Sequence, residues 1–513
     1  RDGGAPELAL PYALLAGDYA RSLYAAGEAE EHYRTAIQLA DEVGDRASQA
    51  QALEKLGWLL WILARFDECA ETLERATRVY QELGDAEGQI RAVGLLGMLL
   101  FTSAPLEGVR RITELLDRLG EQTLRPSSPL ASLYTSLAMN LHIAGQYRRT
   151  VEITERAVEV AEKVGDTRMR TQAETARGTA LATLGDLAVG RRVGEEAIPV
   201  AEANDDYFGQ LLAVHNLGEI CAAQGDFAAS TRHYTRALEL AERLGAKSRI
   251  SAETANLAEI AFYQGDWLQA REQAERAVQI TRGTSTGRAG SYFQYANVYR
   301  QLAMILAAQG DWERALPYLE ESLALAERLP YPEAIRKGQR MLAERDLLLG
   351  RPRAALARLE PLMELATAQG SITRLVPPLA LARAELGDLA GAERMLSEDI
   401  AHARAQGHHL ALVDLLRVRG IVLARQDRRE EALRSLDEAV ALARDTTYPC
   451  AEARALYEQG RVHAEAGEEQ AARQRFEAAL AQFRRLGAQP NVERTTRALA
   501  ALTRPRKASA AGG

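Results

Sequence analysis

Apolar and polar residues alternate along the chain with the period of amphipathic α-helices. In the stretch 66–83 apolar residues recur every three or four positions, and charged residues fill the places between them. The stretch 49–63 carries a second helical pattern with Gly57 near its middle. Gly84 and Asp85 follow, and glycine suits the left-handed end of a helix whereas aspartate caps the next one. Residues 49–85 therefore predict two helices with a break at 64–65.

This two-helix unit recurs through most of the chain. A Gly or Ala occupies the place of Gly57 twelve times, and eight of the eleven spacings are 40 residues, the others being 41, 45 and 37. The twelve residues are Gly17, Gly57, Gly97, Ala138, Gly178, Gly218, Ala258, Ala303, Ala343, Ala380, Gly420 and Gly460. Glycine inside a helix costs about 1 kcal/mol in propensity, so we expect it to allow the close approach of a neighbouring helix. Such a period predicts a stack of helix pairs.

A turn and a second small residue complete the unit. Turn glycines lie seven residues after the small position, at Gly145, Gly185, Gly225, Gly265 and Gly310, and a small residue lies twelve beyond each, at Ala157, Ala197, Ala237, Ala277 and Ser322. This pattern resembles the tetratricopeptide repeat (TPR), whose usual period is 34 residues. It is similar to the longer repeats of the sensor arms of bacterial signalling ATPases, such as the maltose-operon activator and large LuxR-type regulators. The long repeats of kinesin light chains and mitotic-spindle adaptors are also similar.

The resemblance covers residues 8–505 and implies an all-α fold. We expect a right-handed superhelical solenoid of about twelve TPR-like helix pairs plus a C-terminal capping helix. The predicted parts are an N-terminal lead (1–7), repeats one to seven (8–280), a flexible Gly/Ser/Thr loop (281–291), repeats eight to twelve (292–490), a capping helix (491–503) and a disordered tail (504–513). The loop is either a tolerated surface insertion or a binding loop at the groove edge. Prolines and the 37-residue spacing predict a kink or a sub-domain boundary (seam) near 350–378.

Composition narrows the classes of function. The chain has 63 basic and 71 acidic residues, interleaved along the helix faces, which argues against a nucleic acid or a membrane surface as the direct partner. Three widely spaced cysteines predict buried thiols in a reducing cytoplasm. The sequence shows no signal peptide and no apolar run of membrane-spanning length. Because Arg1 takes the place of a start methionine, we expect a fragment or a processed product.

The sequence predicts no enzyme, no cofactor and no metal site. It contains no phosphate-binding loop, nucleophile elbow, zinc-protease helix or CxxC pair. His402, His408 and His409 cluster at a predicted helix end, where solvated histidines are the expected interpretation. A basic C-terminal end is either a charged cap or a dock for an acidic partner; its residues are Arg484, Arg485, Arg494, Arg497, Arg504, Arg506 and Lys507.

The first helix of each repeat is expected to line the concave groove of the superhelix. Trp58 and Trp61 either form an apolar binding patch with their neighbours or complete the packing between helices. Amides at one offset, Asn216, Asn256 and Gln301, could pair with a peptide backbone or bond between repeats. The candidate binding residues are Trp58, Trp61, Met98, Phe101, Met139, His142, His215, Asn216, Glu219, Asn256, Glu259, Phe262, Arg300 and Gln301. Later repeats present a more basic stretch that could accept acidic side chains: Arg300, Arg340, Glu344, Arg417, Arg454, Tyr457 and Arg461.

Two functions remain open. The first is the effector- or partner-sensing arm of a larger bacterial signalling or transcription-regulating ATPase, because the opening stretch resembles the junction that follows such ATPase modules. The second is a stand-alone adaptor that binds a protein or a peptide in the groove. A small-molecule effector is also compatible with the sequence.

Overall fold

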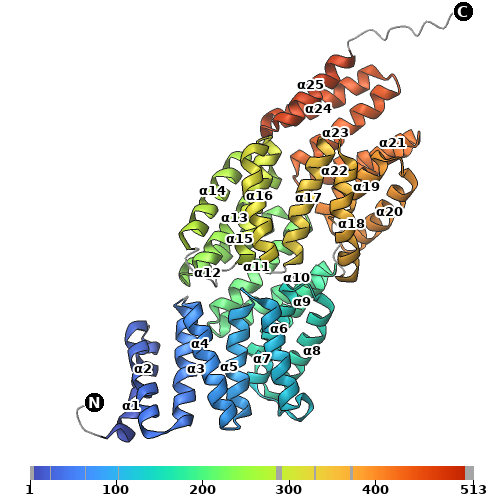
Figure 1. The fold of residues 1–513 in the computed structure, drawn as a ribbon. Helices are drawn as coiled ribbons and strands as arrows, with labels where there is room; N and C mark the ends of the chain where they lie inside the picture. Colours follow the sequence, from blue (N-terminus) through green and yellow to red (C-terminus); the bar gives the residue numbers. More distant parts are fainter. Residues whose placement is uncertain are drawn as a thin grey trace, which may run out of the picture.

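A computed structural model describes residues 5–23, 25–63, 65–101, 103–284, 292–328, 331–369 and 374–502. Within these ranges the chain forms α-helices joined by short turns, with one 3-10 turn at Glu121–Thr123. The helices follow one another as pairs from the N-terminal end to the C-terminal end (Figure 1). The predicted all-α solenoid of twelve helix pairs with a further C-terminal helix is confirmed.

Each repeat consists of a first and a second helix, and α25 (Gln489–Leu502) follows the last pair. The pairs are α1 (Pro6–Ser22) and α2 (Ala26–Val43), α3 (Arg46–Ile62) and α4 (Phe66–Glu82), α5 (Ala86–Leu100) and α6 (Pro105–Leu119), α7 (Ser128–Ile143) and α8 (Tyr147–Val164), α9 (Thr167–Thr183) and α10 (Leu187–Ala203), α11 (Tyr207–Ala223) and α12 (Phe227–Arg243), α13 (Lys247–Gln264) and α14 (Trp267–Thr284), α15 (Tyr292–Gln309) and α16 (Trp312–Arg328), α17 (Pro332–Leu348) and α18 (Pro352–Gln369), α19 (Val376–Glu385) and α20 (Leu389–Ala405), α21 (His409–Arg425) and α22 (Arg429–Asp445), and α23 (Pro449–Glu465) and α24 (Glu469–Leu486).

The structure describes only some of the places where the sequence predicts a break in the repeat pattern. The 37-residue spacing coincides with α19, which is only ten residues long. Residues 281–284 of the predicted loop belong to α14, and its remaining residues, 285–291, lie outside the described residues. The predicted tail at 504–513 and residues 1–4 of the predicted lead also lie outside them.

The Gly-Asp turns end one helix and begin the next. Gly225 has φ +77°, in the left-handed region that favours glycine, and the Asp226 carboxylate accepts a hydrogen bond from the Ala229 amide at 3.0 Å. Asp186 caps α10 in the same way through the Val189 amide at 3.1 Å. A short dipeptide thus reverses the chain and pairs one of the free backbone amides at the start of the next helix.

Where the small residue in the middle of the first helix is glycine, it receives a side chain of the second helix. A Cβ atom added to Gly218 would lie 2.7 Å from the ring of Tyr234, and one added to Gly57 would lie 2.5 Å from Leu73. The expected close approach is therefore an inserted side chain rather than contact between two backbones. Large side chains such as Tyr33, Leu73 and Phe476 are buried at these places.

Successive turns of the superhelix touch one another. The interhelix turns of repeats five to eight lie against the last repeats: Gly185 meets His402, Gly225 meets Thr446, Gly265 meets Pro449 and Gly310 meets Pro490. His409 Nδ1 lies 2.9 Å from the Gln224 carbonyl oxygen in the same interface. The solenoid therefore encloses its own interior.

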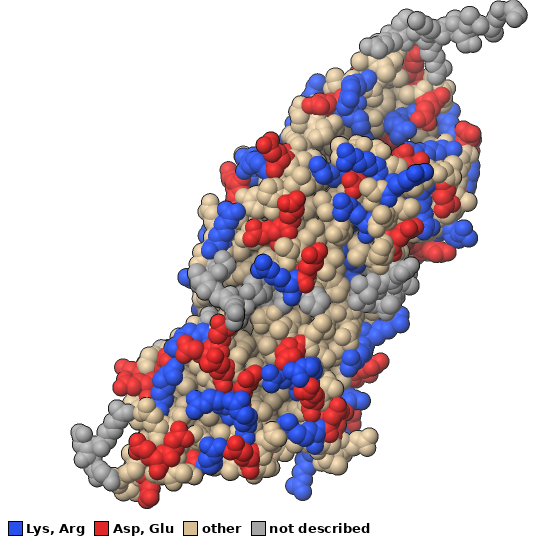
Figure 2. Space-filling view, in the orientation of Figure 1, with Lys and Arg blue, Asp and Glu red and all other residues tan. Residues whose placement is uncertain are grey.

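The three cysteines are buried, as predicted, and burial raises the pKa of the Cys69 thiol to about 12. Each helix that the structure describes is too short or too polar to cross a membrane. Lysine and arginine alternate with aspartate and glutamate over the face of the molecule shown in Figure 2.

Candidate binding site

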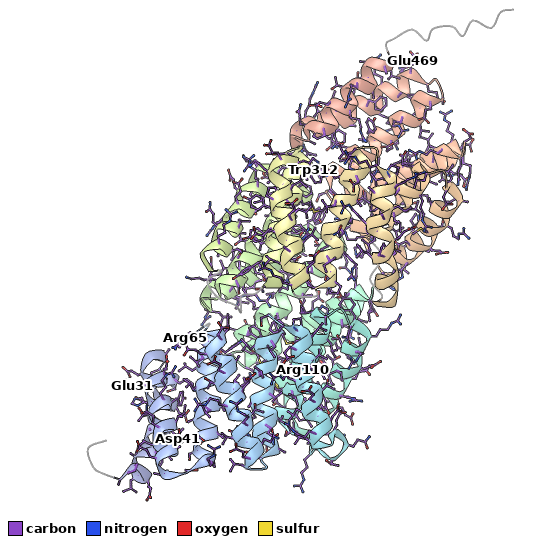
Figure 3. All side chains as sticks on the ribbon, in the orientation of Figure 1. Glu31, Asp41, Arg65, Arg110, Trp312 and Glu469 are labelled. Atoms are coloured by element: carbon purple, nitrogen blue, oxygen red, sulfur yellow. The ribbon has the colours of Figure 1, made fainter. Side chains whose placement is uncertain are left out.

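A central cavity of about 710 Å³ lies inside the superhelix. Its wall comes mainly from the first helices α3, α5, α7, α9, α11, α13, α15 and α17, with contributions from α10, from the residues just before α19 and from the start of α21. Charged side chains such as Glu31, Arg110 and Glu469, labelled in Figure 3, lie instead on the outer surface. The prediction that first helices form the concave wall is consistent with this arrangement.

One wall of the cavity is apolar. Trp58 and Trp61 of α3 line it together with a group from α5, α7 and α11, namely Met98, Phe101, Met139, Phe208 and Leu212. The rings of Trp61 and Phe208 meet edge to face with centroids 6.1 Å apart, although they belong to repeats two and six. The guanidinium of Arg21 covers the ring of Trp58 at 5.0 Å. The apolar wall therefore joins repeats that are distant in sequence.

Another part of the wall is polar and bonded from repeat to repeat. His215 Nδ1 lies 2.9 Å from Glu253 Oε1, and the Asn256 amide donates to Glu253 Oε2 at 3.1 Å. Gln301 Nε2 donates to Asn256 Oδ1 at 3.0 Å and to Glu259 Oε2 at 2.7 Å. These bonds join α11, α13 and α15 through one network of side chains. Such a network holds its members in fixed orientations.

Glu259 connects this network to the next turn of the superhelix. Its carboxylate accepts hydrogen bonds from Arg300 at 3.1 Å and from the Tyr263 hydroxyl at 2.7 Å. Arg374 then donates to the Tyr263 oxygen at 3.2 Å. Although burial alone would raise it, the pKa of Glu259 is lowered, because Arg300 and Lys337 stabilise the charged form.

A sequence match that runs from the fourth repeat to the start of the twelfth identifies the family of the chain. Residues 131–451 match the sequence model of the family described as MalT-like TPR region. The chain belongs to this family. The match confirms the resemblance to the repeats of the maltose-operon activator. Among curated proteins, none matches the MalT-like TPR chain.

Solved structures with similar helical repeats include three that differ widely in size. A Rap protein complexed with Competence and Sporulation Factor is 14% identical, with 75% of this chain and 99% of that chain covered and a TM-score of 0.49. BtubC (BKLC) from P. vanneervenii is 18% identical, with 44% and 92% covered and a TM-score of 0.35. Cut9-Hcn1, an APC/C hetero-tetramer, is 12% identical, with 98% of both chains covered and a TM-score of 0.40.

Thirteen of the fourteen candidate residues line the central cavity of this MalT-like TPR chain: Trp58, Trp61, Met98, Phe101, Met139, His142, His215, Asn216, Glu219, Asn256, Glu259, Arg300 and Gln301. Phe262 is the exception, because it is 5% exposed and stacks on Trp267 with ring centroids 5.0 Å apart in the core. The amides bond between repeats, since Asn216 Nδ2 donates to Thr179 Oγ1 at 2.6 Å and Gln301 donates to Asn256.

The prediction of solvated histidines holds for His402, which is exposed, and only partly for His408 and His409. His408 and His409 are half-buried between turns of the superhelix, and His408 accepts a hydrogen bond from the Ala411 amide at 3.4 Å at the start of α21. Burial, with Arg374 nearby, lowers the pKa of His408 to about 4. His402 lies at the cavity beside Gly185. The contact between superhelical turns, which local sequence does not encode, partly removes the rings of His408 and His409 from open solvent.

The basic stretch of the later repeats is largely paired within the chain. Arg417 and Arg454 lie 3.1 Å and 3.6 Å from Asp414, and Arg340 lies 3.1 Å from Glu344. Burial alone would raise the pKa of Asp414, but these arginines hold it at about 2. This stretch is therefore less open to acidic side chains than its sequence indicates.

Several cavity residues were missed because they lie one helical turn before the first-helix positions that were expected to line the groove. Arg168, Phe208 and Glu333 line the cavity, and each lies ten residues before the small residue of its repeat. A search at this further offset would have found them. Tyr331 and Arg374 also line the cavity, but only the superhelical path brings them there.

Proposed function

We propose that this chain is the regulatory arm of a larger bacterial signalling or transcription-regulating ATPase and that a short peptide or small effector binds in the central cavity. The cavity itself is the observation that supports the proposal. Its volume of about 710 Å³ falls within the range of about 300–1,000 Å³ typical of small-ligand sites. A mostly apolar wall with a few convergent polar groups is also the usual composition of such sites.

The arrangement of the walls suits an amphipathic ligand. An apolar part of the ligand would contact Trp61, Phe208 and Leu212, where burial of apolar surface supplies affinity. Its polar groups would face the network of α11, α13 and α15, whose side chains are already oriented by their mutual hydrogen bonds. Because the wall joins repeats two and six, an occupied cavity would stabilise the contact between them.

A cavity-filling variant tests the location of the ligand. Short peptides and small effectors are screened by thermal shift against the purified chain, and the best compound is measured with Leu212→Trp. Leu268→Trp is the matched control, because Leu268 is 63% exposed on α14 and does not line the cavity. We expect Leu212→Trp to abolish the ligand-induced shift and Leu268→Trp to retain it. A folded Leu212→Trp protein that keeps the full shift would place the ligand elsewhere.

A stand-alone adaptor that binds a protein or a peptide is the second candidate. Both candidates use the same cavity, so the full-length gene separates them. An ATPase module upstream in the same reading frame supports the regulatory arm. A complete reading frame that starts near Arg1 would contradict that role and favour the adaptor.

A further inference from the structure

Four carboxylates line the central cavity, and three of them have a hydrogen-bond donor or a positively charged partner within the described chain. Asp206, Glu259 and Glu333 each have a partner: Gln172 Nε2 at 2.6 Å for Asp206, Arg300 at 3.1 Å for Glu259 and Lys337 at 2.5 Å for Glu333. Glu219 has neither a hydrogen bond nor an ion pair with any residue in the part of the chain that the structure describes. It is the one lining carboxylate in that part left without a partner.

Glu219 faces the cavity from α11, one residue after the small position Gly218. The nearby positive groups already serve other carboxylates, because His215 lies 2.9 Å from Glu253 and Lys337 lies 2.5 Å from Glu333. Desolvation by the surrounding walls raises the pKa of Glu219, and the negative charge of Glu333 adds to the effect, whereas the positive charges of His215 and Lys337 oppose it. Because no cation of the described chain pairs with Glu219 directly and its side chain is exposed at the cavity, its carboxylate is available to a positive group of a ligand.

Two further acceptors on α15 lack donors. Gln294 lines the cavity, is 4% exposed, and its Oε1 has no hydrogen-bond partner among the described residues. Asn297 also lines the cavity and its side chain is hydrogen-bonded to Tyr331, but its Oδ1 likewise has no hydrogen-bond partner among the described residues. Buried polar atoms are nearly always paired in folded proteins. A ligand that carries several N–H groups would satisfy these oxygens.

Tyr331 connects these acceptors to the apolar wall. Burial raises the pKa of Tyr331 well above its usual range, and the nearby charges of Glu333 and Glu219 raise it further. Its ring packs in one cluster with Phe101 and Ile143, against which Met139 also lies. The unpaired oxygens and the apolar wall therefore meet around one side chain.

We propose that the ligand of the central cavity carries an ammonium or guanidinium group that pairs with Glu219, attached to an aromatic or aliphatic group that lies on Phe101 and Met139. This inference rests on the proposed function and names the chemical class of its ligand. An ammonium group has three donors and a guanidinium five, enough to reach Gln294 and Asn297 as well. A peptide with a free amino terminus or a basic side chain beside an apolar one has this composition.

Three probes that share a 2-phenylethyl group and differ in charge test the inference. They are 2-phenylethylammonium, 2-phenylethanol and 3-phenylpropionate, and their binding to the full chain is measured by tryptophan fluorescence and by ligand-observed NMR. Probes of this size bind proteins with a Kd in the range of about 1 mM. We expect the ammonium probe to bind at least about ten-fold more tightly than the alcohol, as a charge-assisted hydrogen bond predicts, and the carboxylate probe most weakly.

Two variants decide whether Glu219 causes the preference. Glu219→Gln keeps the shape and removes the charge, so the preference for the ammonium probe over the alcohol should disappear. Glu242→Gln, on the exposed side of α12, is the matched control and should keep it. The inference is overturned if the ammonium probe fails to bind, if it binds no better than the alcohol, or if its preference survives Glu219→Gln.

The cavity variant Leu212→Trp separates this inference from the proposed function. If Leu212→Trp blocks all probes but the ammonium group brings no advantage, the cavity binds ligands and only the inference about charge is wrong. If probes bind equally well to Leu212→Trp, the proposed function itself fails. Circular dichroism of each variant shows that the helices remain folded.

Discussion

The contact between superhelical turns at Gly225 can be tested by adding one methyl group. In Gly225→Ala the new Cβ would lie 2.4 Å from Thr446 Cγ2, and Thr446 is held in place because its hydroxyl donates to the Leu442 carbonyl oxygen at 2.8 Å. Gly245→Ala is the matched control, since Gly245 is also left-handed, with φ +64°, but has nothing within 4 Å of the added atom.

Both substitutions introduce backbone strain, and only Gly225→Ala also introduces overpacking. A left-handed alanine costs about 1–2 kcal/mol at either site. Overpacking adds about 1–3 kcal/mol at Gly225 only, because either Thr446 or the neighbouring turn must move. We therefore expect Gly225→Ala to lower the free energy of unfolding by about 2–5 kcal/mol and Gly245→Ala by about 1–2 kcal/mol.

Urea unfolding followed by circular dichroism, with hydrogen exchange of α11 and α22, measures these losses. Thr446→Ser removes the atom that clashes, so the double variant Gly225→Ala/Thr446→Ser should recover part of the loss. Equal losses for Gly225→Ala and Gly245→Ala, or no recovery in the double variant, would refute the contact between repeats six and eleven.

Three further predictions concern burial, packing and curvature. Burial raises the pKa of Asp399 to about 7 from an ordinary 3.8, so the folded state keeps its proton while the unfolded state loses it, and stability should fall as pH rises from about 4 to 7. Asp399→Asn should therefore match the wild type near pH 4 in urea unfolding and exceed it above pH 7 by up to about 4 kcal/mol; an equal pH profile would contradict the buried carboxyl. Gly218→Leu should lower the free energy of unfolding by at least about 2 kcal/mol, because Tyr234 already fills the space beside Gly218; an unchanged stability would show that the repeat register is wrong. A double-mutant cycle of Trp61→Leu and Phe208→Leu should give a coupling of about 1 kcal/mol in thermal unfolding, and no coupling would mean that repeats two and six do not meet.

Much of the fold was predictable because helical repeats are encoded locally. The position of Gly57 and its eleven equivalents predicted the order and spacing of the helix pairs, and the Gly-Asp turns predicted where pairs reverse. The placement of first helices on the concave wall followed from the same register. Thirteen candidate residues consequently lie in one cavity, whereas Phe262, at an equivalent offset, packs into the core because Trp267 lies beside it.

The sequence by itself determined the elements of this protein, since periodicity, caps and turns depend on residues only a few positions apart. The tertiary structure alone decided what meets across the superhelix, because a small rotation at each repeat accumulates over many repeats into closure. That closure brings Phe208 to Trp61, and Thr446 to Gly225. It also determines which charges are paired, so the isolation of Glu219 in the cavity is a property of the folded chain and is not visible in its local sequence.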